Sequence, residues 1–334
     1  MRIAFLFCFV FVVLPEPGRA AKVKFKIGSQ APDRSVWGMA LTSIAKDSRT
    51  ATDGQVQFKF YAGGVQGDEQ TVLRKMRIRQ LHGAAFIGQG LSLVYPDSFS
   101  LALPGLFRDD AEFDYVLKEL QPTMTAQCRN RGYEILALLQ LGVAYAYSTK
   151  RIGDIETLRR SKPWLIPGDI MAETYFQVLK ISPVSAGVAD VLTGLQSGLI
   201  HTVISPPTGM IALQWHSRVK YRLDTKLSHA IGVFMVDKRQ WDRLPVATMG
   251  QVREIVDRHV GELTKMVREQ NAEAQAIMNR SGIETIAPNA ETLRQLDSAN
   301  KEVAGLLVGK SFSADVLNRL QQLLKVYREN ADKR

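Results

Sequence analysis

The chain has 334 residues, of which 46% are hydrophobic and 23% are charged, and its formal net charge is +10 at pH 7. This is ordinary globular composition, long enough for one large or two medium domains. The basic residues are scattered, and neither zinc-finger spacing nor an aromatic RNA-binding pattern accompanies them. We therefore expect no nucleic-acid partner.

Residues 1–20 have the features of a secretory signal peptide. A positive start precedes an unbroken apolar run at 3–14, and Gly18 and Ala20 supply the small residues of a cleavage site. The twelve residues of this run are too few to span a bilayer, which takes about 20. We expect a soluble periplasmic protein that is cleaved after Ala20. Its single remaining cysteine, Cys128, is expected to be packed rather than reactive.

The first part of the mature chain alternates predicted strands and helices. Residues 22–28 and 55–64 place apolar side chains at every second position, as strands with one buried face do. Ser35 is placed to cap a helix between them, and Asp68 to open a second helix before an apolar strand at 82–88. This β-α-β-α-β order predicts a parallel sheet with covering helices.

The same rhythm continues to the C-terminal end. Further strands are predicted at 133–141, 164–168, 199–207 and 229–238, with helices at 169–179 and 189–198. Residues 249–282 form one helix longer than a small domain needs, followed by a short strand and two polar helices. We expect two α/β units, and ligands of such folds bind at the carboxyl ends of the strands. Two facing units suggest a cleft that closes on a solute.

The usual catalytic and metal-binding signatures are missing. The sequence has no GxSxG, HExxH, CxxC or phosphate-binding loop, and its histidines do not occur at metal-ligand spacing. Asp68 and Glu69 resemble an acid–base pair, but acidic residues in a first helical turn also stabilise the helix dipole. We expect a binding protein without metal or cofactor, not an enzyme.

Several segments, in order along nearly the whole mature chain, resemble one family. They are APDRSVWGMAL (31–41), FYAGGVQGDEQTVLRKMRIRQLHGA (60–84), LALPGLFRDDAEF (101–113), STKRIGDIETLRR (148–160), the IPG turn (166–168), GLQSGLIH (194–201) and VDKRQWDRLP (236–245). Together they are similar to the solute-binding proteins of tripartite ATP-independent periplasmic (TRAP) transporters, of the dicarboxylate-binding type.

The resemblance implies a periplasmic binding protein-like fold, with two α/β domains around a ligand cleft and a long helix bracing both. It implies delivery of one small molecule to the membrane permease subunits of a TRAP transporter. The expected boundaries are 24–147 and 233–268 for domain I, 148–232 and 269–320 for domain II, and 321–334 for a C-terminal tail.

The sequence departs from the family where relatives bind the ligand carboxylate. The family strand before the Pro-Gly turn reads Lys-Ile-Arg-Val-Pro, and its planar guanidinium suits bidentate pairing with a carboxylate. Here residues 163–167 read Pro-Trp-Leu-Ile-Pro, so Leu165 occupies the place of the arginine. Val143 replaces a second arginine, and Ser205 replaces an asparagine. Pro167 and Pro206 anchor this alignment; the alternative is that it is shifted by one residue.

The predicted cleft lining is apolar with one carboxylate and one hydroxyl. It comprises Glu69, Ile87 and Gly88 from domain I, and Val143, Leu165, Val188, Ile204 and Ser205 from domain II. Because an unpaired carboxylate in a closed apolar cleft costs several kcal/mol, we expect an uncharged or largely apolar, lipid-like ligand. Two alternatives stay open. One is an organic acid bound by a cation from elsewhere, such as Arg159, Arg160 or Lys162, and the other is a lipid carrier or sensor without a permease.

Overall fold

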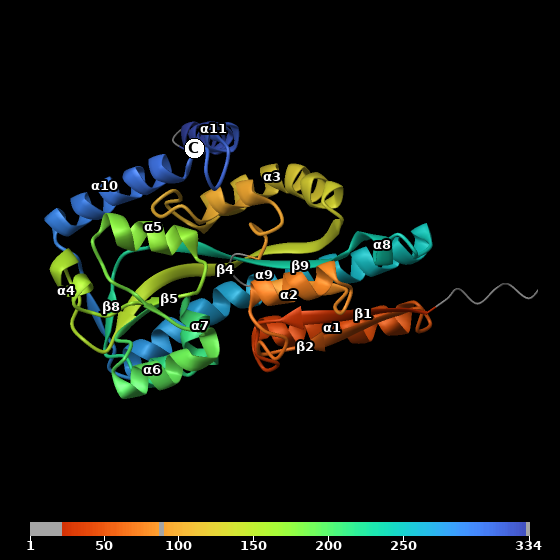
Figure 1. Cartoon of the computed structure of the whole chain (residues 1–334), viewed down its shortest axis with the longest axis horizontal. Helices are drawn as coiled ribbons and strands as arrows, with labels where there is room; N and C mark the ends of the chain where they lie inside the picture. The colour runs from red at the N-terminus through yellow and green to blue at the C-terminus, as the bar shows by residue number, and fades with distance from the viewer. Residues whose placement is uncertain (1–21, 87–89, 332–334) are drawn as a thin grey trace, which may run out of the picture.

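The computed structural model describes residues 22–86 and 90–331. Its main sheet has eight strands, in the order β10-β8-β4-β9-β3-β1-β2 with β7 also paired to β4, and β5 and β6 form a second, two-stranded sheet. The strands are β1 (Val23–Ser29), β2 (Val56–Tyr61), β3 (Gly83–Phe86), β4 (Tyr133–Ser148), β5 (Trp164–Leu165), β6 (Val184–Ser185), β7 (Thr202–Ser205), β8 (Tyr221–Leu223), β9 (Ser228–Asp237) and β10 (Glu284–Ile286). The architecture is a two-part α/β fold (Figure 1).

The first part is built on β2, β1 and β3, which are parallel as predicted. Its helices are α1 (Val36–Ala51), α2 (Glu69–Arg77), the 3-10 helix η1 (Pro96–Ala102), α3 (Asp110–Asn130), α8 (Lys238–Trp241) and α11 (Ala314–Ala331). The predicted caps are confirmed, because Ser35 accepts a hydrogen bond from the Gly38 N–H and Asp68 accepts one from the Thr71 N–H. The 21-residue helix α3 lies outside the predicted elements, and Pro122 in its interior weakens its helical pattern.

Two antiparallel strands, β4 and β9, connect the two parts (Figure 1). β4 is longer than predicted, because it continues through Gly142 to Ser148. Its pairing with β9 is irregular between Gln140 and Gly142, where Gly142 has φ of +117°, which L side chains rarely adopt. The strand thus passes through the boundary between the parts with a local kink rather than a break.

The second part surrounds the end of β4 with shorter elements. β7 and β8 pair with opposite edges of β4 over residues 145–148. The helices of this part are α4 (Ile155–Arg159), α5 (Ile170–Val178), η2 (Val188–Asp190), α6 (Val191–Ser197), α7 (Pro207–Ala212), η3 (Trp215–Ser217) and α10 (Ala290–Leu307). Asp169 caps α5 by accepting a hydrogen bond from the Ala172 N–H. One apolar cluster lies on the α5 and α10 side of this part, and another on the α6 and α7 side.

The helix α9 (Val246–Arg280) has 35 residues and spans both parts, as predicted (Figure 1). Its buried residues Val252 and Val256 belong to a cluster of the first part, whereas Met278 belongs to a cluster of the second. The domain boundary predicted at residue 320 falls inside α11, which continues to Ala331. Leu323 and Leu324 of α11 pack in the apolar cluster of α2 and α3. Residues 321–331 are therefore packed helix, not a separate tail.

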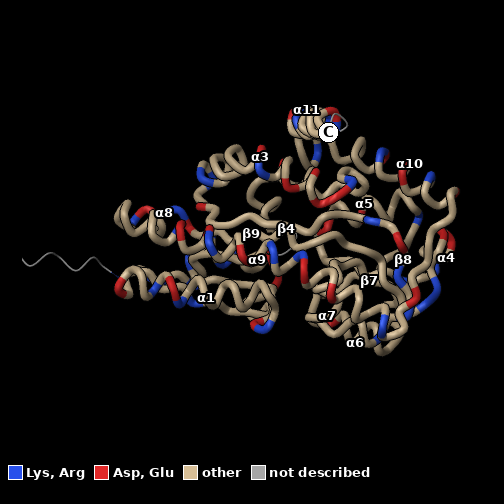
Figure 2. The backbone as a smooth tube through the Cα atoms, turned by 180° about the vertical axis from the view of Figure 1, so that it is seen from behind, with Lys and Arg blue, Asp and Glu red and all other residues tan. Residues whose placement is uncertain are grey.

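The burial of the cysteine and the mixed distribution of charged residues agree with the globular composition of the chain. Cys128 is fully buried, as expected of a packed cysteine, and burial raises the pKa of its thiol to about 12. Basic and acidic residues are interspersed along the backbone seen in Figure 2. Within the described residues, none of the helices combines the length and hydropathy that crossing a membrane requires. The predicted signal peptide lies outside these residues.

Candidate ligand-binding site

The two parts meet where the first turn of α2 faces the turn after β5. Gly168, in the Pro-Gly turn, has φ of +81°, and a Cβ atom placed on it would lie 2.4 Å from Gln70 Nε2. Gln70 is the second residue of α2. Sequence segments far apart in the chain thus approach each other across the boundary, as expected for the two lips of a cleft.

The lip from the first part consists of the glycine-rich loop and the first turn of α2. It carries acidic residues, and hydrogen bonds hold it in place. Gln30 Nε2 donates to the Gly67 carbonyl at 2.6 Å, which holds the glycine-rich loop before α2. The hydrogen bond from Thr71 to Asp68 lowers the pKa of Asp68, so this carboxylate is ionised at neutral pH. Glu69 follows it and is half-buried. Ile87 and Gly88 lie outside the described residues.

Leu165 is enclosed in the interior of the second part. Its exposed fraction is 6%, and it belongs to the same apolar cluster as Phe99 of η1 and Phe176 of α5. Its neighbour Trp164 packs in the opposite cluster, where its Nε1–H donates to the Ala186 carbonyl at 2.8 Å. The strand therefore presents an aliphatic side chain in apolar surroundings.

The cations nearest in sequence are directed elsewhere. Arg159 donates from Nε to the Leu179 carbonyl at 2.9 Å and forms an ion pair with Glu156. Arg160 and Lys162 are exposed. Lys162 has a backbone φ of +42° in the turn that precedes β5.

The other predicted ligand residues of the second part fall on both of its apolar clusters. Ser205 is 7% exposed, pairs with Tyr145 of β4, and donates its hydroxyl to the Pro206 carbonyl at 3.0 Å. Ile204 is half-buried and packs on the α5 side, whereas Val188 is half-buried and packs on the α6 side. Val143 is half-buried opposite His229 of β9. Only Leu165 and Ile204 share one cluster.

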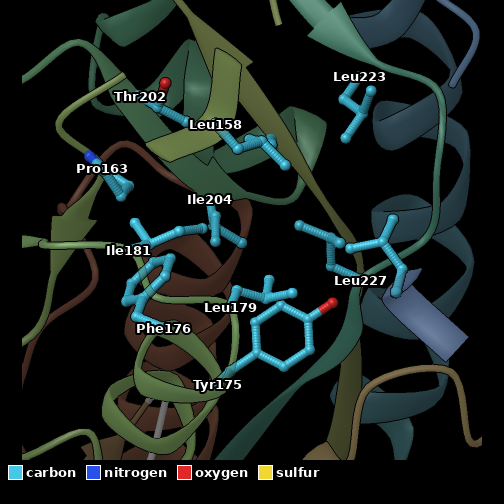
Figure 3. Close-up of a pocket in the computed structure, with 12 residues that line it drawn as sticks. Leu158, Pro163, Tyr175, Phe176, Leu179, Ile181, Thr202, Ile204, Leu223 and Leu227 are labelled. Carbon is cyan, nitrogen blue, oxygen red and sulfur yellow. The ribbon is translucent and has the colours of Figure 1, made fainter. Parts of the chain in front are cut away.

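A small apolar cavity lies beside this shared cluster (Figure 3). Its volume is about 20 Å³, enough for one methyl-sized group or one water molecule. Tyr175 and Phe176 of α5 line one side, Thr202 and Leu158 the other, and Ile204 lies between them. Because the surrounding side chains are apolar, we expect the cavity to be dry. A larger, open hollow of about 520 Å³ lies between α3, β4 and α9, and none of the predicted ligand residues lines it.

Sequence reasoning missed the residue that joins α9 to this region. Asn271 of α9 donates from Nδ2 to the Leu141 carbonyl at 3.2 Å. Its Oδ1 accepts from the Thr208 N–H at 3.1 Å and from the Thr208 hydroxyl at 3.0 Å. A Cβ on Gly142 would lie 2.4 Å from Asn271 Nδ2. Gly142, directly after the strand predicted at 133–141, could have signalled this close approach.

A second cluster missed from sequence lies beside the same kink. The His229 ring stacks on Phe113 at a centroid distance of 4.9 Å, and its Nε2 lies 3.5 Å from Asp110 Oδ1. Gln140 Nε2 donates to the same Asp110 oxygen at 2.8 Å. His229 and then this hydrogen bond lower the pKa of Asp110 against the opposing effect of burial.

Comparison with known proteins places this geometry in a family. Residues 27–307 match the family described as bacterial extracellular solute-binding protein, family 7. The fold is similar to three TRAP periplasmic solute-binding proteins of known structure. One from Xanthobacter autotrophicus, with bound β-D-galacturonate, has 20% identity and a TM-score of 0.82 over 90% of this chain and 99% of that chain.

The second is from Fusobacterium nucleatum, with bound sn-glycerol-3-phosphate, at 16% identity and a TM-score of 0.83 over 93% of this chain and 99% of that chain. The third is from Bordetella pertussis, binds pyroglutamic acid, and has 16% identity and a TM-score of 0.81 over 91% and 99% of the two chains. These likenesses establish a two-part α/β fold, and the family match identifies the class of protein as a solute-binding protein. The chain belongs to family 7 of the bacterial extracellular solute-binding proteins.

Proposed function

We propose that this chain is the periplasmic solute-binding component of a TRAP transporter and that its ligand is uncharged or largely apolar, with a lipid-like molecule as one such ligand. The chain would be exported by cleavage of residues 1–20 and would deliver its ligand to membrane permease subunits. The observation that carries the proposal is that Leu165 is 6% exposed among apolar side chains. We propose that it occupies the place of the family's carboxylate-binding arginine.

Electrostatics support this choice of ligand. A carboxylate removed from water needs a cation or several hydrogen-bond donors to offset its desolvation. Arg159 is engaged by Glu156 and a main-chain carbonyl, while Arg160 and Lys162 are exposed. The ionised Asp68 on the facing lip adds a negative charge. Each of these features disfavours an anionic ligand near Leu165.

Apolar contact offers the alternative source of affinity. Burial of apolar surface contributes about 25 cal/mol per Å², so a ligand burying a few hundred Å² reaches roughly micromolar affinity without an ion pair. We propose that Leu165, Val143, Val188, Ile204 and Ser205 form the wall of the second domain. Glu69, Ile87 and Gly88 would face them. The domain boundaries proposed from the sequence place Leu165, Val188, Ile204 and Ser205 in domain II, opposite Glu69, Ile87 and Gly88. Val143 lies at the end of domain I, in the strand that crosses to domain II.

A second candidate is the binding of an ordinary organic acid. It is favoured by the structural neighbours, which were solved with galacturonate, glycerol-3-phosphate and pyroglutamic acid. In that case a cation from outside the flanking segment would pair with the ligand.

The third candidate is a lipid carrier or sensor that serves no permease. A gene for a multi-span permease next to this one would argue against it.

The test begins with mass spectrometry of the small molecule that co-purifies with the protein. Calorimetry should then show no binding of succinate, malate, fumarate, galacturonate or pyroglutamate to the unmodified chain. Leu165→Arg should weaken binding of the co-purified molecule because it buries an unpaired cation. Leu165→Met, of similar volume, is the matched control and should retain binding. Micromolar or tighter binding of any of these acids to the unmodified chain would refute the apolar-ligand proposal.

A further inference from the structure

We infer that the lysine-bearing face of β1 and β2 is a docking surface for an anionic phospholipid bilayer. We define this basic face by Lys24, Lys26 and Lys59, which are all exposed. The inference concerns a surface outside the ligand-binding site and does not depend on the identity of the solute.

The strand register places the three lysines side by side. β1 and β2 are parallel, and Lys26 is paired directly with Lys59, while Lys24 is paired with Gln57. Lys24 and Lys26 alternate with the buried Val23, Phe25 and Ile27, so both project from the face opposite to the core. Neighbouring strands lie about 4.8 Å apart and alternate residues about 7 Å apart along a strand. The three ammonium groups therefore extend from one small, flat area.

The helix α2 covers this face only near Gly28, at the C-terminal end of β1. A Cβ on Gly28 would lie 2.9 Å from Val72 of α2, so the even-numbered side chains of β1 are on the α2 side. The start of β1 extends beyond the end of α2 (Figure 1). Lys24 and Lys26 are both exposed on this face. In the described part of the chain, neither they nor Lys59 form an ion pair with an acidic side chain.

Like charges directly opposite each other on neighbouring strands lower the stability of a sheet. Lys26 and Lys59 form such a pair, and the ring of His82 beside Lys26 adds no compensating negative charge. Burial first, and then the Lys26 charge, lower the pKa of His82, with a smaller opposing effect of Asp237. An anionic partner would relieve this repulsion.

More positive charge surrounds the basic face. Arg77 and Arg79 are exposed at the end of α2, shortly before His82, whose main-chain N–H donates to the Lys26 carbonyl. Gln240 of α8 donates to the Lys24 carbonyl and accepts a hydrogen bond from Arg243. Clustered Lys and Arg residues bind anionic membrane surfaces additively, and a flat sheet face suits a planar partner better than a small solute. Members of this family are extracellular, so such a surface is accessible to them.

The test is flotation of the full chain with vesicles of phosphatidylcholine alone or mixed with phosphatidylglycerol, at low and at physiological ionic strength. We expect binding only to the phosphatidylglycerol vesicles, and weaker binding as salt screens the charges. The variant Lys24→Gln, Lys26→Gln and Lys59→Gln should reduce the partition coefficient more than tenfold, in line with additive attraction by each lysine.

The matched control changes three exposed lysines elsewhere, Lys118→Gln, Lys265→Gln and Lys310→Gln, with the same loss of net charge. We expect it to bind like the unmodified chain. An equal loss in both triple variants would assign the attraction to net charge and overturn the inference, as would absence of binding to phosphatidylglycerol at low salt.

The basic-face variant should unfold at the same or a higher temperature than the unmodified chain, because removal of the Lys26–Lys59 repulsion favours the folded state. A lower unfolding temperature would show that the lysines stabilise the sheet instead.

Discussion

Replacement of Asn271 by leucine should destabilise the junction between the two parts. Asn271 caps the start of α7, because the N-cap residue Pro206 provides no side-chain hydrogen bond and Asn271 Oδ1 accepts from the Thr208 N–H instead. The same side chain donates to the Leu141 carbonyl next to the kink in β4. Leucine has a similar volume but neither accepts nor donates, so the change isolates the polar contacts.

The expected loss follows from the three hydrogen bonds. Each contributes about 0.5–1.5 kcal/mol, and groups left without a partner in a half-buried site add to the loss. We expect Asn271→Leu to lower the free energy of unfolding by about 2–4 kcal/mol and the midpoint by roughly 5 °C in scanning calorimetry. Because α7 begins directly after Ser205 and Pro206, binding of the co-purified ligand should weaken as well.

Two further variants make this reasoning refutable. Asn271→Asp keeps the acceptor for both Thr208 donors and loses only the contact with Leu141, so its destabilisation should be smaller. Thr208→Val removes one of the same bonds, and the double variant with Asn271→Leu should therefore lose less than the sum of the two single effects. Additive losses, or a loss below about 0.5 kcal/mol for Asn271→Leu, would show that the asparagine does not hold the junction.

Three further experiments test the contact between α2 and the turn after β5, the dependence of stability on acid pH, and the closure of the cleft. Gly168→Ala should cost about 1–2 kcal/mol in thermal unfolding, because φ is +81° there; adding Gln70→Ala relieves the contact across the cleft but not the backbone strain. Asp110 has a lowered pKa in the folded state, so its stabilising effect is present at neutral pH and is lost as the pH falls below about 4. Asp110→Asn should therefore unfold at a midpoint that depends less on pH in this acid range. X-ray scattering should show a smaller radius of gyration at saturating ligand, and an unchanged radius would contradict closure of the cleft.

Local sequence patterns determined many of the elements and several of their ends. Alternating apolar residues at 22–28 and 55–64 predicted strands of the first part, Ser35 and Asp68 cap the helices that they were expected to begin, and Asp169 stands at the predicted start of α5. These features depend on residues two to four positions apart, so they can be read from a short window of sequence. The length of α9 follows from the same local information, and the parallel direction of β1, β2 and β3 follows from the alternation of strands and helices along the chain.

Only the tertiary structure decided which distant residues meet. Nothing near Asn271 in the sequence indicates that it bonds Leu141 and Thr208, since each contact spans more than 60 residues. The sequence predicted Leu165 as a ligand residue, but its burial depends on helices and strands from other parts of the chain. Burial and contact across the chain are properties of the packed elements, whereas helix and strand formation is largely local. That physical difference explains why the elements were predicted and the junction between the two parts was not.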